Sequence, residues 1–528
     1  MGFDTKHGWI QKTLDGVSIS HAGTFLNLEK IINAILTNPK DFQNLSNRLD
    51  NENLSFGLII EAQDYTLAIS DRVQGYTIYY NQINGEIFTN PTDIKNLDTQ
   101  SVLEFATAGY VLGNNTLNKD IKQLQAGELV YIDKTKSKPA IKTHRYYCYA
   151  PKPVTSEKTK TQWKSELGET LDNIIQRTIH SCEDRPICVP LSGGLDSRLL
   201  LAKFHEHGVK NLYTFSYGIK GNFEAEMAEK VASMIGIKWF MVPSNPKKLK
   251  TLYESDERKS YEAGAHGVSR IPSYVEFEAL KTLKEQKLIP ENAVIINGQS
   301  GDFISGGHIP TSLFENENPN EKDMYSYMLG KHFSLWRNLK TPEIEDKIKT
   351  HIAELLLPDD PTLSLKDNLI RQYESFEWQE RQCKMVVNGQ KAYNFFGYDW
   401  RLPLWDKELM DFFEKVPWHL KYNQNLFKSY LRDYNYKGIF EFGSAEPKVW
   451  KPHQYWILCL GRLIGLLQSK EAKEDYYKKM YYYGDQLFQY GLFDKALFDK
   501  HYKDLRNMMS LAVLDYMEEH NIPFPNAA

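Results

Sequence analysis

The chain has 528 residues, enough for two to four domains with large buried cores. Its net charge of −4 gives no electrostatic case for nucleic-acid binding, and its 41% hydrophobic content is typical of a soluble globular protein. The five scattered cysteines indicate neither a disulfide framework nor a zinc site, and we expect a cytoplasmic protein without a signal peptide or membrane span.

A polar, proline-bearing stretch at 149–157 predicts a boundary between two domains, 1–150 and 160–528. The second domain opens on a helix, because Leu167, Leu171, Ile174 and Ile175 follow a helical spacing. No internal repeat, low-complexity tract or coiled coil is evident in the sequence.

Short apolar runs alternate with helical patterns after this first helix. Strands are predicted at 187–191, 212–216, 239–242 and 293–296, and helices at 199–204, 228–235 and 275–283. Gly208 and Gly236 stand where the first two of these helices should end. The alternation predicts an α/β domain in which a parallel sheet has helices on both faces. Ligands of such sheets bind at the carboxyl ends of the strands.

The stretch from Ser192 to Ser197 reads Ser-Gly-Gly-Leu-Asp-Ser and follows the first predicted strand. Two glycines let the backbone approach a phosphate closely, and free N–H groups at a helix N-terminus bind anions. Asp196 offers a hard oxygen ligand for Mg²⁺. The stretch lacks the GxxxxGK[ST] pattern of the P-loop. It resembles instead the SGGxDS pyrophosphate loop of the ATP-pyrophosphatases, which cleave ATP to AMP and pyrophosphate.

A second block, Asn297 to His308, follows the fourth predicted strand and reads NGQSGDFISGGH. It resembles the GEGxDExFGGY element of asparagine synthetases and β-lactam synthetases. That resemblance implies that Asp302 joins Asp196 in holding Mg²⁺. Gln299 and Phe303 replace two acids of the family pattern, and His308 replaces a tyrosine. These departures leave the substrate contacts open.

A third block, 397–406, reads GYDWRLPLWD and resembles the family's GxExRxPFxD segment, with Asp399 in place of the usual glutamate. Lys421 matches a lysine that follows in the family, and Lys428 to Arg432 resembles the KxxLR helix. Three ordered blocks over 165–455 make the resemblance to the asparagine synthetase family specific.

The same resemblance implies roles for further residues. A catalytic lysine, which would hold the acyl-adenylate and its phosphate, is assigned first to Lys451 and second to Lys448. ATP would be bound by residues in two groups. Pyrophosphate would lie against Ser192, Gly193, Gly194 and Ser197, and adenosine against Leu191, Tyr217, Asn297 and Gly298.

The N-terminal part also resembles this family. Residues 70–80, SDRVQGYTIYY, are similar to its ARDRxGxxPLYY segment, and 110–127 to the stretch that precedes its linker. The resemblance implies an α+β nucleophile-hydrolase sandwich that acts as a glutaminase through a cysteine at position 2. Gly2 stands there, and the first cysteine is Cys148. We therefore expect a glutaminase-like fold without its chemistry, unless the true start lies upstream and supplies a cysteine.

The family implies that a carboxylate attacks Mg-ATP to give an acyl-adenylate, which ammonia or another amine converts to an amide. Aspartate is the best-known acid, whereas peptides and sugar acids of polysaccharides are alternatives, and a β-lactam precursor is disfavoured. A tRNA-modifying pyrophosphatase and a non-catalytic nucleotide-binding regulator are the competing classes. Neither a basic patch nor paired cysteines support the first, and the two aspartates disfavour the second. A homodimer is a possible assembly.

Two regions stay outside these motifs. Residues 309–396 are a long insertion, which either shapes a substrate pocket or only adds packing. Tyrosines alternate with lysines over 476–490, and a helix bundle that packs its aromatic rings explains this better than a nucleic-acid surface.

Overall fold

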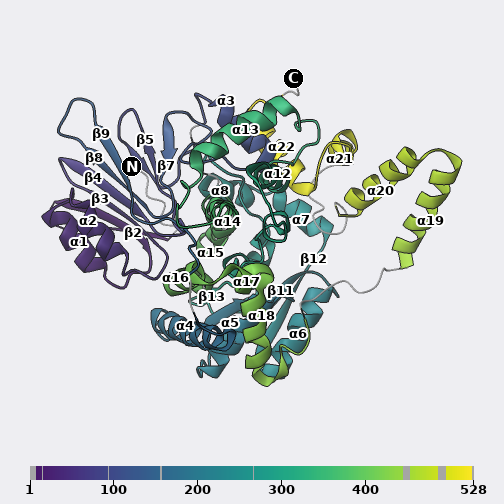
Figure 1. Ribbon diagram of the computed structural model, residues 1–528, viewed down its shortest axis with the longest axis horizontal. Helices are drawn as coiled ribbons and strands as arrows, with labels where there is room; N and C mark the ends of the chain where they lie inside the picture. The colour runs from purple at the N-terminus through teal and green to yellow at the C-terminus, as the bar shows by residue number, and fades with distance from the viewer. Residues whose placement is uncertain are drawn as a thin grey trace.

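The computed structural model describes residues 8–14, 16–92, 94–154, 157–265, 267–443, 452–485 and 495–525. Antiparallel strands lie at the left of Figure 1, and a parallel sheet lies below and to the right of its centre. Among the described helices, none has both the length and the apolar content needed to cross a bilayer.

The N-terminal part is built on antiparallel strands. A six-stranded sheet has the order β1-β2-β3-β4-β8-β9, and a three-stranded sheet has the order β6-β5-β7. Their bounds are β1 Trp9–Leu14, β2 Val17–Gly23, β3 Phe56–Glu61, β4 Tyr65–Ser70, β5 Tyr79–Asn81, β6 Ile87–Phe88, β7 Ile121–Gln123, β8 Glu128–Asp133 and β9 Ala140–Arg145. Helices α1 (Leu28–Thr37), α2 (Phe42–Leu49) and α3 (Thr99–Ala108) accompany them. An α+β unit therefore precedes the second sheet.

The second sheet is parallel, with the order β12-β11-β10-β13-β14, which confirms the predicted α/β architecture. Its strands are β10 Ile187–Pro190, β11 Leu212–Ile219, β12 Lys238–Ser244, β13 Val294–Ile296 and β14 Asp399–Arg401. All three side chains of β13 are fully buried, and successive side chains point to opposite faces, so both faces of the sheet are covered. Strand β14 was not predicted.

The helices that alternate with these strands begin with α4 (Lys160–Ser181), where the four predicted apolar residues are buried. α5 spans Leu195–Glu206, and α6 spans Phe223–Ile235 and ends, as predicted, at Gly236 in the left-handed conformation. α7 (Pro246–Tyr253), α8 (Asp256–Ala265) and α9 (Phe277–Glu285) follow. Their arrangement brings the carboxyl ends of β10 and β13 together, because these strands are neighbours.

The insertion folds as helices α11 (Thr311–Phe314), α12 (Glu321–His332), α13 (Pro342–Leu355) and α14 (Leu365–Phe376), a π-helical stretch (Glu377–Val386) and α15 (Lys391–Phe395). α13 packs on α3 of the N-terminal part, and α22 (Met508–Glu519) packs there too. These helices share a hydrophobic core that is separate from the core under the parallel sheet. The insertion therefore connects the two parts of the chain. This is a packing role, one of the two roles that the sequence left open for it.

The remaining elements close the fold. They are α10 (Gly301–Ile304), α16 (Lys407–Lys415), α17 (Trp418–Lys421), α18 (Asn425–Tyr434), α19 (Pro452–Leu467), α20 (Lys470–Asp485) and α21 (Lys495–His501). α19 and α20 form a hairpin that extends outward at the right of Figure 1, and α20 contacts the chain beyond α21, where the hydroxyl of Tyr502 donates to Asp475 (2.9 Å). In the described part of the tyrosine-rich tail, Tyr477 packs within this hairpin and donates a hydrogen bond to the carbonyl of Leu458 (2.9 Å), as expected of a helix bundle.

Candidate nucleotide and metal site

A cavity of about 460 Å³ lies at the carboxyl ends of β10, β11 and β13. The predicted nucleotide and metal residues that line it are Leu191, Ser192, Gly194, Asp196, Ser197, Tyr217, Asn297, Gly298 and Asp302. Gly193 does not line the cavity, and its carbonyl accepts a hydrogen bond from the guanidinium of Arg198 (3.1 Å). Two loops that lie a hundred residues apart in the sequence thus face one space.

The first loop connects β10 to α5 and is closed on itself by its two serines. The backbone N–H of Ser192 donates to Oγ of Ser197 (3.2 Å), and the N–H of Gly194 donates to Oγ of Ser192 (3.1 Å). Gly194 is the N-cap residue of α5, and no side chain caps the N–H groups that follow it. Uncapped N–H groups at the positive end of a twelve-residue helix favour an anion such as a phosphate.

The second loop follows β13 and packs directly on the first. Ser300 takes a left-handed φ of 68°, and α10 begins behind it. The backbone N–H of Asp302 donates to Oδ2 of Asp196 (3.1 Å). Glycine at 301 is required by this approach, because a Cβ there would lie 2.5 Å from Cγ of Asp196 and 2.6 Å from Cδ1 of Leu404.

The electrostatics of the two aspartates call for a cation. Burial and, second, the charge of Asp302 raise the pKa of Asp196 to about 8. Burial acts to raise the pKa of Asp302, but the hydrogen bond from His308 (3.1 Å), the charge of that imidazole and the N–H of Phe303 together lower it. Two adjoining carboxylates are the hard oxygen donors that Mg²⁺ prefers, so the residues present fit this ion.

His308 connects this aspartate pair to the insertion. Its Nδ1 lies 2.9 Å from Oε1 of Glu377, a buried residue of the π-helical stretch, while its Nε2 lies against Asp302. Burial lowers the pKa of His308, but the two carboxylates overcome this and raise it to about 9. π-helical segments occur frequently at functional sites. The end of the insertion therefore supports the site from behind, in addition to its packing role.

The other three departures from the family pattern lie in different surroundings. Gln299 lines the cavity and accepts a hydrogen bond from Gln390 (2.6 Å). Phe303 is fully buried against Trp405 and does not line the cavity. Asp399 is exposed and pairs with Arg185 (2.6 Å) outside it. Only Gln299 and His308, of the four departures, can affect what the cavity binds.

Glu276 is a cavity residue that the sequence did not single out. Oε1 accepts from the hydroxyl of Tyr217 (3.4 Å), and the hydroxyl of Tyr393 donates to Oε2. Nδ2 of Asn297 donates in turn to that Tyr393 hydroxyl (2.6 Å). Burial raises the pKa of Glu276 to about 7. A single glutamate before a helix carries no motif, so only the fold could reveal it.

Lys451 and Lys448, the predicted catalytic lysines, lie outside the described residues. The chain before them is fixed beside the first loop through Arg198. Its guanidinium donates to the carbonyls of Gly193 (3.1 Å) and Gly443 (3.3 Å). Residue 443 therefore lies one side chain away from the glycine loop.

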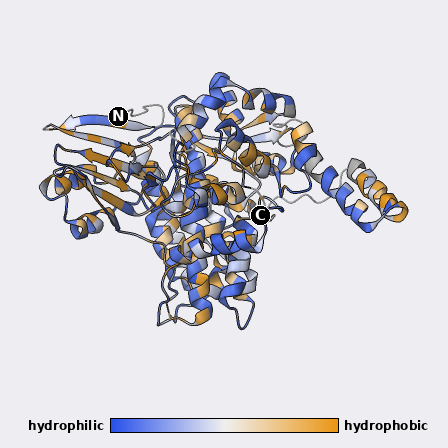
Figure 2. Cartoon of the chain, turned by 90° about the horizontal axis from the view of Figure 1, so that it is seen from above, coloured by the Kyte–Doolittle hydropathy of each residue, from blue (hydrophilic) through white to orange (hydrophobic). Residues whose placement is uncertain are grey.

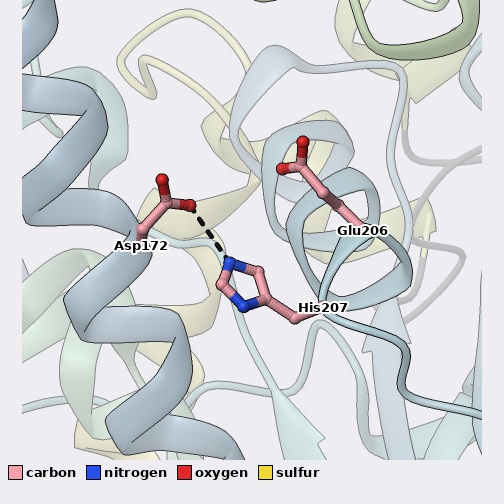
Figure 3. A group of neighbouring side chains, drawn as sticks. All are labelled: Asp172, Glu206 and His207. Atoms are coloured by element: carbon pink, nitrogen blue, oxygen red, sulfur yellow. Dashed lines mark hydrogen bonds and ion pairs between the residues drawn. The ribbon is translucent and has the colours of Figure 1, made fainter.

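Two other groups of side chains in the described part of the chain have the spacing of metal ligands. In one, Asp172 faces Glu206 and His207 (Figure 3). Lys203 already lies between its two carboxylates, 2.8 Å from Asp172 and 3.1 Å from Glu206. The second group, Glu262, Glu519 and His520, contains Arg258 in the same way. Each group thus has a cationic side chain in place of a metal.

Gly301→Ala is expected to slow any reaction that depends on Asp196 by ~10-fold or more, because its Cβ displaces that carboxylate. A magnesium titration of the activity should show a higher requirement for the ion. Gly330→Ala is the matched control, since nothing lies within 4 Å of a Cβ at that helical position. It should leave the rate unchanged and stabilise α12 slightly. Equal rates for the two variants would contradict the close approach.

Comparison with known proteins agrees with the site. The model of the asparagine synthase family matches residues 166–517, which include every residue that lines the cavity. No curated protein matches the chain. A structure of glutamine phosphoribosylpyrophosphate amidotransferase from B. subtilis, complexed with ADP and GMP, matches 55% of this chain at 9% identity, with a TM-score of 0.16. The match covers 64% of that chain, and a TM-score this low carries no argument.

Proposed function

Since the family match covers more than half of the chain, the protein belongs to the asparagine synthase family, and we propose that it is an ATP-dependent carbon–nitrogen ligase. Its substrates are a small carboxylic acid and ammonia or another amine, and its products are an amide, AMP and pyrophosphate. The observation that carries this proposal is the convergence of an uncapped helix N-terminus and two carboxylates on one cavity.

In the first step, a carboxylate oxygen of the acid attacks the α-phosphorus of ATP, and the bond to the β-phosphate oxygen breaks. Pyrophosphate leaves against the uncapped N–H groups at the start of α5, which the helix orients before the reaction begins. Asp196 and Asp302 would hold Mg²⁺, which neutralises charge on the leaving pyrophosphate. Tyr217, Asn297 and Leu191 would contact the adenosine.

In the second step, the amine nitrogen attacks the acyl carbon, AMP departs, and the nitrogen loses a proton. Glu276 is an acceptor that the cavity offers for that proton, because its pKa of about 7 allows it to be ionised and still basic at neutral pH. Lys451, with Lys448 as second choice, would hold the acyl-adenylate. The attachment of Gly443 beside the loop supports this assignment.

For the N-terminal part, we propose a nucleophile-hydrolase sandwich of the glutaminase type that makes no ammonia. The two antiparallel sheets support this fold, and none of their described strands contains a cysteine. A thiolate is the nucleophile for this amide hydrolysis, so the nitrogen donor would come from solution.

The decisive experiment is exchange of labelled pyrophosphate into ATP, because it reports reversible adenylation before any amine is needed. We expect Mg²⁺-dependent exchange with one member of a panel of acids, tested with aspartate first and then with peptides and uronic acids. Exchange with aspartate would favour asparagine as product, and exchange with another acid would change only the product. Tight ATP binding without exchange for any acid would contradict the ligase and favour a regulator.

Lys451→Ala and Lys448→Ala form a matched pair for the second step. We expect Lys451→Ala to lower the rate of amide formation by ~100-fold, because a positioned charge on the transition state is lost, and Lys448→Ala to lower it less than ~10-fold. Amide formation is followed as AMP release in the presence of the amine. The reverse order of effects would transfer the role to Lys448.

A further inference from the structure

The hairpin of α19 and α20 has one face that packs internally. Gly461 is buried, and the ring of Tyr477 occupies the space that a Cβ at 461 would need. A Cβ at Gly465 would lie 2.9 Å from Cδ of Lys473. These two glycines, four residues apart, let α20 approach α19 closely, so this side of α19 is already used.

The opposite face of α19 is apolar and exposed. Trp456 (72% exposed), Leu460, Leu463 and Leu467 (74%) follow one another at intervals of four, three and four residues. Tyr455, Cys459 and Leu466 flank this row. We call these seven residues the α19 seam. The hairpin is the part of Figure 2 that extends farthest to the right, and its outer end is orange. Intervals of four and three are those of a seam between two paired helices.

The size of the seam matches a dimer interface. Six large side chains and Cys459 would bury roughly 600 to 800 Å² per copy, and a stable interface buries ~800 Å² on each partner. A pair of helices with one face in water buries too little apolar surface to be stable alone. A second hairpin would complete a four-helix bundle, in which each helix has a buried face.

The charges of the hairpin disfavour a membrane as the partner. Helices that lie in the membrane interface carry many lysines and arginines on their polar face. Arg462 is the one lysine or arginine of α19. The four lysines of α20 are balanced by Glu471, Glu474, Asp475 and Asp485. An uncharged apolar row is self-complementary, as a twofold interface requires.

We propose that the α19 seam binds the α19 seam of a second copy of this chain about a twofold axis. The dimer then consists of two bodies joined by a bundle of two α19–α20 hairpins. This inference does not depend on the catalytic proposal, since no residue of the seam lines the cavity.

The test compares the full-length chain with Leu460→Glu/Leu463→Glu by sedimentation velocity at micromolar concentration. The wild type should sediment as a dimer, and the double variant as a monomer with a dissociation constant raised at least ~100-fold, because two charges per copy would be buried in the interface. Leu365→Glu, a substitution at an exposed leucine at the start of α14, is the control and should remain dimeric.

Circular dichroism and the melting temperature check that the double variant is folded. A wild type that is monomeric at micromolar concentration, or a dimer that survives both glutamates, would overturn the proposal. Flotation with vesicles of phosphatidylcholine and phosphatidylglycerol tests the other occupant. Binding of a monomeric wild type to these vesicles, lost in the double variant, would assign the seam to a lipid surface instead.

Discussion

Asp196→Asn is expected to slow carboxylate-dependent exchange of pyrophosphate into ATP by ~100-fold or more. The substitution keeps the size of the side chain and the acceptor for the N–H of Asp302, but it removes the charge that would hold Mg²⁺. Asp399→Asn is the matched control, because Asp399 is exposed and lies outside the cavity. Its exchange rate should stay within about twofold of the wild type.

Asp196→Asn should also be more stable than the wild type in the absence of divalent ions. The pKa of Asp196 is about 8 in the fold and 3.8 ordinarily, so the unfolded chain ionises first as the pH rises. Stability is therefore lost between those two values, and asparagine avoids this loss. We expect a higher melting temperature for Asp196→Asn in EDTA at pH 8. A normal exchange rate would contradict the metal role, and a lower melting temperature would point to misfolding.

Local sequence patterns were sufficient to predict four strands of the parallel sheet, but not β14 at one of its edges. Strand β13 is a continuous apolar run, as expected of a strand covered on both faces. Strand β14, Asp399–Arg401, has no apolar run, and it is a strand because Val294 and Ile296 pair with it. The sequence contains no local signal for such a partner-dependent strand.

The candidate site also contains residues that local sequence motifs predict and residues that they do not. The glycine-rich loops could be found because phosphate binding needs glycines and an acid at fixed spacing within one loop. Glu276 precedes α9 and Tyr393 lies in α15, so the two meet only through tertiary packing. Phe303 was one of the departures from the family pattern that left the substrate contacts open. In the structure it is a core residue, because α10 turns it toward Trp405. The direction of a side chain in a short helix depends on how the fold seats that helix.

Lys421 matches a position of the family motif, and in the structure it contacts other segments of the protein. Its ammonium group is fully buried and donates to Oε2 of Glu374 (2.8 Å) and to the hydroxyl of Tyr149 (2.8 Å). Glu374 belongs to the insertion, and Tyr149 lies in the segment between the two sheets. The backbone of Lys421 also packs on Gly306 of the loop that carries Asp302. One buried ion pair therefore connects three segments that support the site.

Lys421→Met is expected to destabilise the chain by about 3–5 kcal/mol, because it leaves the Glu374 carboxylate buried without its partner. Glu374→Gln should be costly as well, since the ammonium group then loses its counter-charge. The double variant Lys421→Met/Glu374→Leu should recover most of the loss, because two apolar side chains of similar size need no partner. Urea denaturation of the four proteins gives the coupling free energy. Additive losses in the double variant would show that the two residues contribute through separate packing, and that the pair does not act as a unit.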